Sequence, residues 1–209
     1  MGATLAAIPL RQRAGALQSG PMDQDTADEE LMLRYAAGDV TAFELLYARH
    51  RGGLYAFVAR QSPVAAWVDD IYQDAWLAVT RSRTDYRPSA AFRTWLYQIA
   101  RNRLIDLVRQ HQPARLARYL ADEDDDPAAS LPDPAPGPDA VAERQQRKAA
   151  LEQALATLPP AQREAFLLRE HAELSVDDIA AMTGVTPETA KSRLRYALNK
   201  LKTALAGRV

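Results

Sequence analysis

The sequence contains no cysteine in its 209 residues, which excludes disulfide bridges and metal sites built on thiolates. No apolar run approaches the roughly 20 residues that a membrane-spanning helix needs, so we expect no membrane insertion. Histidine is scarce, and His50, His111 and His171 are scattered without a nucleophile beside them. We therefore expect a protein that is not an enzyme and that carries no metal and no cofactor.

The first 20 residues include some apolar side chains, but arginines interrupt them and the apolar core is too short for a signal peptide. Residues 1–27 are interpreted as a disordered tail, and Met22 is a second candidate for the true start. Without a signal peptide or a membrane span, the expected location is the cytoplasm.

The net charge of −1 hides an uneven distribution of charge along the chain. Residues 81–110 contain seven Arg and two Asp, whereas residues 121–140 contain seven acidic residues and no basic one. The near-neutral net charge is therefore the sum of basic modules and an acidic connector. A locally basic module is typical of proteins that bind nucleic acid.

Residues 113–142 have the composition of a linker. An acidic run at residues 122–126 is followed by several prolines, and such a segment cannot bury a core. The flanking residues have helical spacing and no strand pattern. The sequence thus predicts an all-α fold of two small helical domains, residues 28–112 and 143–207, joined by a flexible acidic, Pro-rich linker.

The stretch from Ser175 to Pro187 has the local signals of two helices joined by a tight turn. Ser175 and Asp178 form a capping-box pattern, and Gly184 suits a helix end in the left-handed conformation. Thr186 can cap the second helix, with Pro187 at its first position. This order predicts a helix-turn-helix that places its second helix in the DNA major groove, although an ordinary helical hairpin has similar signals.

The second helix of this pair separates an apolar stripe from a polar face. The stripe consists of Ala190, Leu194, Ala197, Leu198, Leu201 and Leu205. The polar face carries Glu188, Ser192, Arg195, Tyr196 and Asn199, with Lys191, Arg193 and Lys202 at its flanks. From Thr186 to the end, six basic residues stand against one acidic residue, which favours contact with DNA.

A helix predicted over residues 68–79 combines an apolar face with an acidic and amide face. Leu77 lies in the middle of the polar face, beside Asp70, Gln73 and Asp74. A leucine in this setting suggests a docking surface for another protein. Single exposed leucines are common on protein surfaces, so the spacing alone leaves both interpretations open.

The helix predicted over residues 92–110 mixes basic and aromatic side chains. Arg93, Tyr97 and Arg101 are expected on the face opposite the core, where rings can stack on unpaired bases and arginines can meet phosphates. Trp95 on its own is better explained as a core residue than as a stacking platform. Arg103 falls on the apolar side, and Asp106 is its expected ion-pair partner.

The order of these segments, with WLYQIARNRLID, then LPPAQREAFLL, then SVDDIAAMTGVTPETAKSRLRYALNKLK, resembles bacterial sigma factors of the extracytoplasmic-function group. The resemblance covers about residues 28–206. It implies a protein that binds core RNA polymerase through the β′ clamp helices and the β flap, and that directs promoter recognition and DNA melting. It also implies that an anti-sigma factor is a partner.

The resemblance further implies a role for individual residues. Residues 28–112 correspond to the region that docks on polymerase and binds the minus-ten element, and residues 143–207 to the region that reads the minus-thirty-five element. The polymerase-docking residues are Asp70, Gln73, Asp74 and Leu77. The minus-ten residues are Arg83, Tyr86, Arg87, Ser89, Arg93, Trp95, Tyr97 and Arg101. The upstream-element residues are Glu188, Thr189, Lys191, Ser192, Arg193, Arg195 and Tyr196.

Two other classes of protein are compatible with parts of the sequence. A stand-alone helix-turn-helix regulator accounts for the C-terminal domain but needs neither the docking helix nor the Arg–aromatic helix. An enzyme is suggested only by Asp69, Asp70 and Asp74, which are similar to the metal-binding DDxxD motif of terpenoid synthases but have the wrong spacing.

Overall fold

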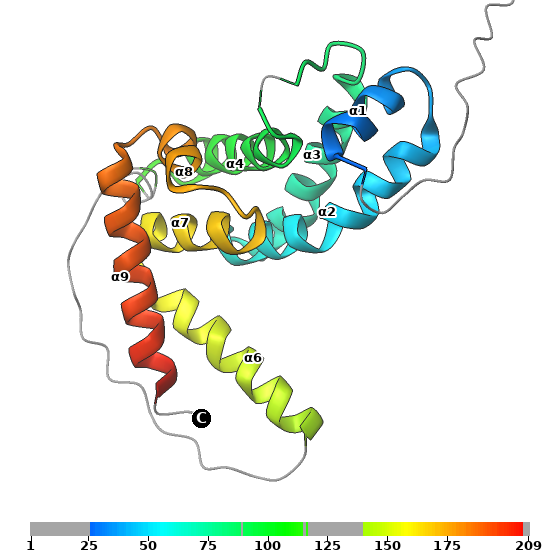
Figure 1. Ribbon diagram of the computed structural model, residues 1–209. Helices are drawn as coiled ribbons and strands as arrows, with labels where there is room; N and C mark the ends of the chain where they lie inside the picture. The colour runs from blue at the N-terminus through cyan, green and yellow to red at the C-terminus, as the bar shows by residue number, and fades with distance from the viewer. Residues whose placement is uncertain (1–25, 89, 115, 117–139, 207–209) are drawn as a thin grey trace, which may run out of the picture.

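The computed structural model describes residues 26–88, 90–114, 116 and 140–206, and within them the chain is helical and contains no strand (Figure 1). The N-terminal bundle consists of α1 (Asp28–Ala36), α2 (Val40–Gln61), the short 3₁₀ helix η1 (Ala65–Trp67), α3 (Val68–Arg81) and α4 (Phe92–His111). The C-terminal bundle consists of α6 (Ala140–Thr157), α7 (Pro160–His171), α8 (Val176–Thr183) and α9 (Pro187–Ala206). The predicted all-α fold is confirmed, whereas the predicted tail and linker fall almost entirely outside the described residues.

Helix α2 is the centre of the N-terminal bundle, since α1, α3 and α4 all pack against it. The core between these helices contains the fully buried side chains of Leu46, Leu54, Phe57, Ile71 and Leu96. The start of α4 is fixed from a distance, because the Phe92 amide donates to Glu29 Oε1 at 2.7 Å. Ala91 offers no side-chain cap to α4, so the carboxylate of Glu29 satisfies a helix-end amide that would otherwise lack a partner.

The helix-turn-helix signals of the C-terminal bundle are present as the sequence predicts. The Ser175 hydroxyl accepts from the Asp178 amide at 3.1 Å, and Asp178 Oδ2 accepts from the Ser175 amide at 3.2 Å. Gly184 ends α8 with φ of 72° in the left-handed region. Thr186 Oγ1 accepts from the Thr189 amide at 3.2 Å at the start of α9. Local chemistry therefore fixes the turn that sets the angle of α9.

Replacement of Gly184 by alanine is expected to lower the free energy of unfolding by about 1–2 kcal/mol. A left-handed backbone brings Cβ too close to the neighbouring carbonyl oxygen, and only glycine avoids this cost. Urea unfolding of the full chain measures the change. Gly52 lies inside α2 with ordinary helical geometry, so Gly52→Ala should instead stabilise the protein by about 0.5–1 kcal/mol. Equal stability of Gly184→Ala and the wild type would contradict this account of the turn.

The two bundles are packed against each other rather than separated. Helix α7 lies along α2, and the buried apolar side chains of both bundles form one continuous cluster (Figure 1). Helix α9 in turn runs against α6, α7 and α8. The sequence predicts two helical bundles, but it does not predict this direct contact, which brings Glu164 and His171 of α7 to residues of α4 that are expected to face DNA.

Two expectations about single residues are wrong. Arg103 does not pair with Asp106: its Nε donates to Asp74 on α3 at 2.7 Å, while Asp106 accepts from Arg109 at 3.0 Å. The packing of α3 beside α4 brings Asp74 within reach of Arg103, and both side chains are 42% exposed, so Arg103 is not a core residue. Leu198 is 54% exposed and does not belong to the buried stripe of α9.

Candidate nucleic-acid and polymerase interfaces

The outward face of α3 presents an apolar side chain among acidic and amide groups. Leu77 is 45% exposed, and Asp70 and Gln73 on the preceding turns are exposed as well. Asp74 belongs to the same face, although its carboxylate is held by Arg103. The face is therefore accessible and its geometry suits a protein partner, while the role of its four residues stays a prediction.

The N-terminal half of α9 presents a polar face to solvent directly after the Gly184 turn. Glu188, Lys191, Arg195 and Tyr196 are exposed, and Thr189 and Ser192 are partly so. The Arg195 guanidinium lies over the Tyr196 ring at 5.1 Å from its centroid, which restrains both side chains.

Arg193 departs from the predicted reading face. Its side chain is only 7% exposed, so in this structure the C-terminal bundle encloses it and keeps it from a DNA phosphate. The helical spacing explains the difference, because Arg193 lies three positions after Ala190 and four before Ala197 and so shares the buried side of α9 with them. Direct contact between Arg193 and DNA is therefore not supported by its position.

The loop between α3 and α4 divides into exposed arginines and a buried ring cluster. Arg83 and Arg87 are exposed, and the Arg83 guanidinium lies 5.6 Å from the centroid of the Tyr35 ring. The Tyr86 ring is buried 5.2 Å from the ring of Trp95, and burial raises the pKa of Tyr86 to about 12. The Tyr86 ring therefore packs on the inner side of the loop, whereas Trp95 is only partly buried. Ser89 lies outside the described residues.

The predicted DNA-facing side of α4 meets α7 through an ion pair. Arg101, 7% exposed, donates from Nε to Glu164 Oε1 at 3.0 Å and from Nη2 to Glu164 Oε2 at 3.4 Å. Glu164 belongs to α7 and is itself buried. The expectation that Arg101 faces solvent is therefore not met in this arrangement of the bundles, because a carboxylate of the other bundle holds its guanidinium.

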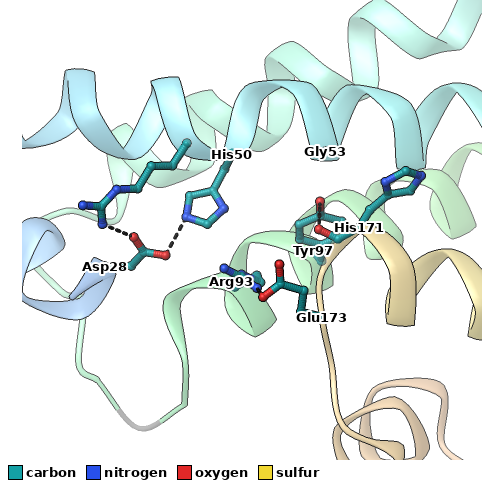
Figure 2. A pocket seen from close by; sticks show the side chains of 8 residues that line it. Asp28, His50, Gly53, Arg93, Tyr97, His171 and Glu173 are labelled. Carbon is teal, nitrogen blue, oxygen red and sulfur yellow. Dashed lines mark hydrogen bonds and ion pairs between the residues drawn. The ribbon is translucent and has the colours of Figure 1, made fainter. Parts of the chain in front are cut away.

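Tyr97 and Arg93 meet the segment that follows α7. The Tyr97 hydroxyl, on a ring that is 1% exposed, donates to the His171 carbonyl oxygen at 2.9 Å, and Arg93 pairs with Glu173 (Figure 2). Gly53 of α2 lies beside the same contact: a Cβ at this position would be 2.7 Å from the Tyr97 hydroxyl oxygen. Of the four predicted DNA-binding residues of α4, Arg93, Tyr97 and Arg101 are thus engaged by the C-terminal bundle, whereas Trp95 packs against Tyr86 and Phe92 of its own bundle.

A polar cavity of about 370 Å³ lies between the bundles at this point (Figure 2). On one wall Asp28 accepts from Arg49 at 2.8 Å and lies 2.6 Å from His50 Nε2. Burial alone would raise the pKa of Asp28, but hydrogen bonds from His50 and Arg49 outweigh burial and hold it below the ordinary value. The Arg93–Glu173 pair forms the facing wall. The charged groups that line the cavity are thus paired with one another.

Acidification is expected to weaken the contact between the bundles through His171. Burial lowers the pKa of His171 below 6.5. The Arg60 guanidinium, 2.8 Å from His171 Nε2, lowers this pKa further, whereas the charge of Glu170 raises it. The packed state therefore favours neutral His171. The stability that neutral His171 contributes to the packed state is fully present above pH 6.5. It is lost as the pH falls through the lowered pKa of His171.

Urea unfolding at pH 7.5 and pH 5.5 measures this effect, with His171→Gln as the matched variant. The glutamine variant should lose less stability on acidification than the wild type, since both share the other titrating groups. Identical pH dependence in the two proteins would show that His171 does not report on the contact.

Sequence reasoning missed the partners that cover α4. Glu164 lies in the segment LPPAQREAFLL, for which no single functional residue is predicted, and Glu173 is an exposed residue after the same helix. Gln61 is fully buried, and its side-chain amide donates to the Pro160 carbonyl at 3.3 Å. No periodic pattern marks such residues, because their partners are more than 60 positions away. Within the described ranges no cluster of three acidic or histidine residues is suited to a metal ion.

Comparison with protein families matches residues 46–114 to Sigma-70 region 2 and residues 148–201 to Sigma-70 region 4. The chain is 33% identical over 175 residues to the RNA polymerase sigma factor CarQ of Myxococcus xanthus, a match that covers 83% of this chain and 95% of CarQ. It is 33% identical over 177 residues to the ECF RNA polymerase sigma factor SigM of Mycobacterium tuberculosis, covering 85% of this chain and 84% of SigM.

Among solved structures, CnrH in complex with the cytosolic domain of CnrY is similar with a TM-score of 0.59 and 26% identity, covering 88% of this chain and 100% of CnrH. Both halves of the chain thus match regions of one protein class in the same order. The chain belongs to the extracytoplasmic-function sigma factors of bacterial RNA polymerase. It acts with core RNA polymerase to direct promoter-specific initiation of transcription. No helix in the described part of the chain is long and apolar enough to cross a membrane.

Proposed function

We propose that residues 28–112 dock on core polymerase and bind the minus-ten element, and that residues 143–207 read the minus-thirty-five element. The observation that carries this division is the exposure of two separate faces, one on α3 around Leu77 and one on α9 around Arg195. Each face lies in a different matched sigma region. Residues 113–142 connect the two regions and let them reach separate promoter elements.

The α3 face acts through protein contacts. Leu77 supplies the apolar centre, and the surrounding Asp70, Gln73 and Asp74 supply charge and hydrogen bonds that suit basic groups on the clamp helices of the β′ subunit. A small apolar centre with a polar rim is the usual anatomy of a protein interface. The C-terminal bundle adds a second contact, with the β flap.

The exposed face of α9 acts through contacts with bases and phosphates. Arg195 suits a guanine edge in the major groove, where bidentate hydrogen bonding identifies the base. Lys191 and Lys202 at the margins of this face are exposed and suit phosphates, which fix position without reading sequence. In the N-terminal bundle, Arg83 and Arg87 are the exposed residues of the minus-ten set.

Binding, rather than catalysis, accounts for the whole activity in this proposal, and the chain works in the cytoplasm beside the polymerase. An anti-sigma factor is a further proposed partner. The complex of CnrH with the cytosolic domain of CnrY supports it, because the similarity covers 100% of CnrH and 88% of this chain. A stand-alone helix-turn-helix regulator is not favoured, since residues 46–114 match a polymerase-binding sigma region.

Reconstitution with purified core polymerase tests the proposal. The tagged full-length chain should retain core enzyme on a column, and the resulting holoenzyme should give run-off transcripts from a pool of genomic promoter fragments that core enzyme alone leaves silent. Sequencing of the transcripts then yields the two promoter elements. Failure of the chain to retain core enzyme would overturn the proposal, and specific DNA binding without polymerase would support the stand-alone regulator instead.

A further inference from the structure

The proposed polymerase-docking face is not confined to α3, because a side chain of α4 holds one of its carboxylates. Arg103 Nε donates to Asp74 Oδ2 at 2.7 Å, and the two side chains are each 42% exposed. We propose that Arg103 is a positioning residue for polymerase docking: it holds the Asp74 carboxylate in the orientation that a basic group on the clamp helices meets. This inference rests on the proposed docking function of the α3 face.

Asp74 is the carboxylate of this face that α3 itself stabilises least. Asp70 lies in the first turn of α3, where the helix dipole favours negative charge, whereas Asp74 lies in the middle of the helix, beyond the reach of that effect. The two carboxylates are four positions apart, a spacing at which like charges on a helix repel each other. The guanidinium beside Asp74 offsets this repulsion, so both carboxylates can occupy the same face.

The geometry of the pair leaves half of the Asp74 carboxylate for a partner. The bond from Arg103 uses Oδ2, and among the described residues Oδ1 accepts no hydrogen bond. Because Asp74 is still partly exposed, Oδ1 can accept from a basic group of the polymerase while Oδ2 stays bonded. A carboxylate that is already held at one oxygen loses less conformational freedom when the partner binds, and such preorganisation raises affinity.

A second ion pair on α4 provides a comparison. Arg109 Nη1 donates to Asp106 Oδ1 at 3.0 Å within one turn of the same helix, and these side chains are 62% and 58% exposed. Asp106 is also three positions from Arg103, yet the Arg103 guanidinium lies on Asp74, 29 positions away on a neighbouring helix. Because α3 and α4 pack together, this bond fixes Asp74 relative to the fold, which a pair within one helix turn does not do.

Charge alone and positioning predict opposite effects for the loss of Arg103. The docking face is acidic and suits a basic partner, so removal of a positive charge at its edge should tighten binding if Arg103 acts only through its charge. If Arg103 orients Asp74, its loss should weaken binding even though the face becomes more acidic. The sign of the change in affinity therefore separates the two roles.

The affinity of full-length variants for purified core polymerase measures this sign, by anisotropy of a fluorophore on the N-terminal amine. Arg103→Ala should weaken the affinity about threefold to tenfold, the usual range for loss of one preorganised side chain. Arg103→Lys keeps a cation but not the planar fork and should recover part of the loss. Arg109→Ala removes the same charge from α4 and should retain the wild-type affinity. An affinity of Arg103→Ala equal to the wild type, or tighter, would overturn the proposal.

A double-mutant cycle tests whether Arg103 acts through Asp74. Asp74→Ala should weaken the affinity for core polymerase, and Arg103→Ala should have no further effect once Asp74 is alanine. A further loss in that background would show that Arg103 binds the polymerase itself and would overturn positioning. Wild-type affinity of Asp74→Ala would overturn it as well, since there would be no contact for Arg103 to position.

The free chain gives a readout that does not depend on polymerase. In a ¹⁵N spectrum of the full chain, the Nε–Hε signal of Arg103, assigned by its loss in Arg103→Lys, should shift on Asp74→Ala, whereas that of Arg109 should not. An Arg103 signal that does not respond would show that the pair is absent and would overturn the proposal. Unfolding curves of Arg103→Ala should match the wild type, because exposed ion pairs contribute little to stability. Failure of the wild type to bind core polymerase would instead refute the proposed function, and the spectrum would still decide whether the pair forms.

Discussion

Reversal of charge at Asp70 and Asp74, each replaced by lysine, is expected to abolish retention of core polymerase while leaving the fold intact. Both side chains lie on the outward face of α3, away from the buried Ile71 and Ala75. The exchange breaks the Asp74–Arg103 pair, but exposed ion pairs are typically worth only about 0–1 kcal/mol. Column retention of core enzyme and run-off transcription measure the effect, with circular dichroism as the check on folding.

Two further variants make this experiment specific to the face. Lysine at the exposed positions Asp106 and Asp177 changes the net charge equally but lies on other helices, and this control should bind polymerase normally. Leu77→Ala should weaken binding without a change of charge, since it removes the apolar centre of the face. Normal polymerase binding by the Asp70, Asp74 variant would refute the assignment of this face.

The parts of the fold that follow from local chemistry could be predicted from sequence. The capping box at Ser175, the left-handed Gly184 and the start of α9 at Pro187 are set by residues within a few positions of one another. The separation of buried and exposed residues on α3 follows from helical periodicity in the same way. Such short-range signals identify helices, their ends and their outward faces.

The contact between bundles could not be predicted, because nothing local specifies it. Arg101 and Glu164 are 63 positions apart, and the same arginine in an open chain would be a surface residue with the same helical spacing. The partner of Arg103 could not be predicted for a related reason: Asp106 is closer in the chain, but tertiary packing brings Asp74 within 2.7 Å. Only the placement of whole helices decides between such partners.

The two exposed cations of α9 differ in a way that predicts separable effects. The Arg195 guanidinium lies over the Tyr196 ring, which restrains it on the polar face of α9. Lys202 lies nearly two turns further along the helix and is exposed on a flexible side chain. A restrained planar donor suits a base edge, whereas a flexible point charge suits a phosphate.

Arg195→Ala is therefore expected to relax the preference of the holoenzyme at one or two positions of the upstream element, a loss of about 1–3 kcal/mol of discrimination at each. Lys202→Ala is expected to weaken binding to all sequences alike and to reduce the salt dependence by about one ion. Run-off transcription with core polymerase on a library of upstream elements, repeated at several salt concentrations, measures both. Neither substitution alters a buried side chain, so unfolding curves should match the wild type. If both variants gave the same uniform loss with no change of sequence preference, Arg195 would be a phosphate contact and the proposed reading face would be wrong.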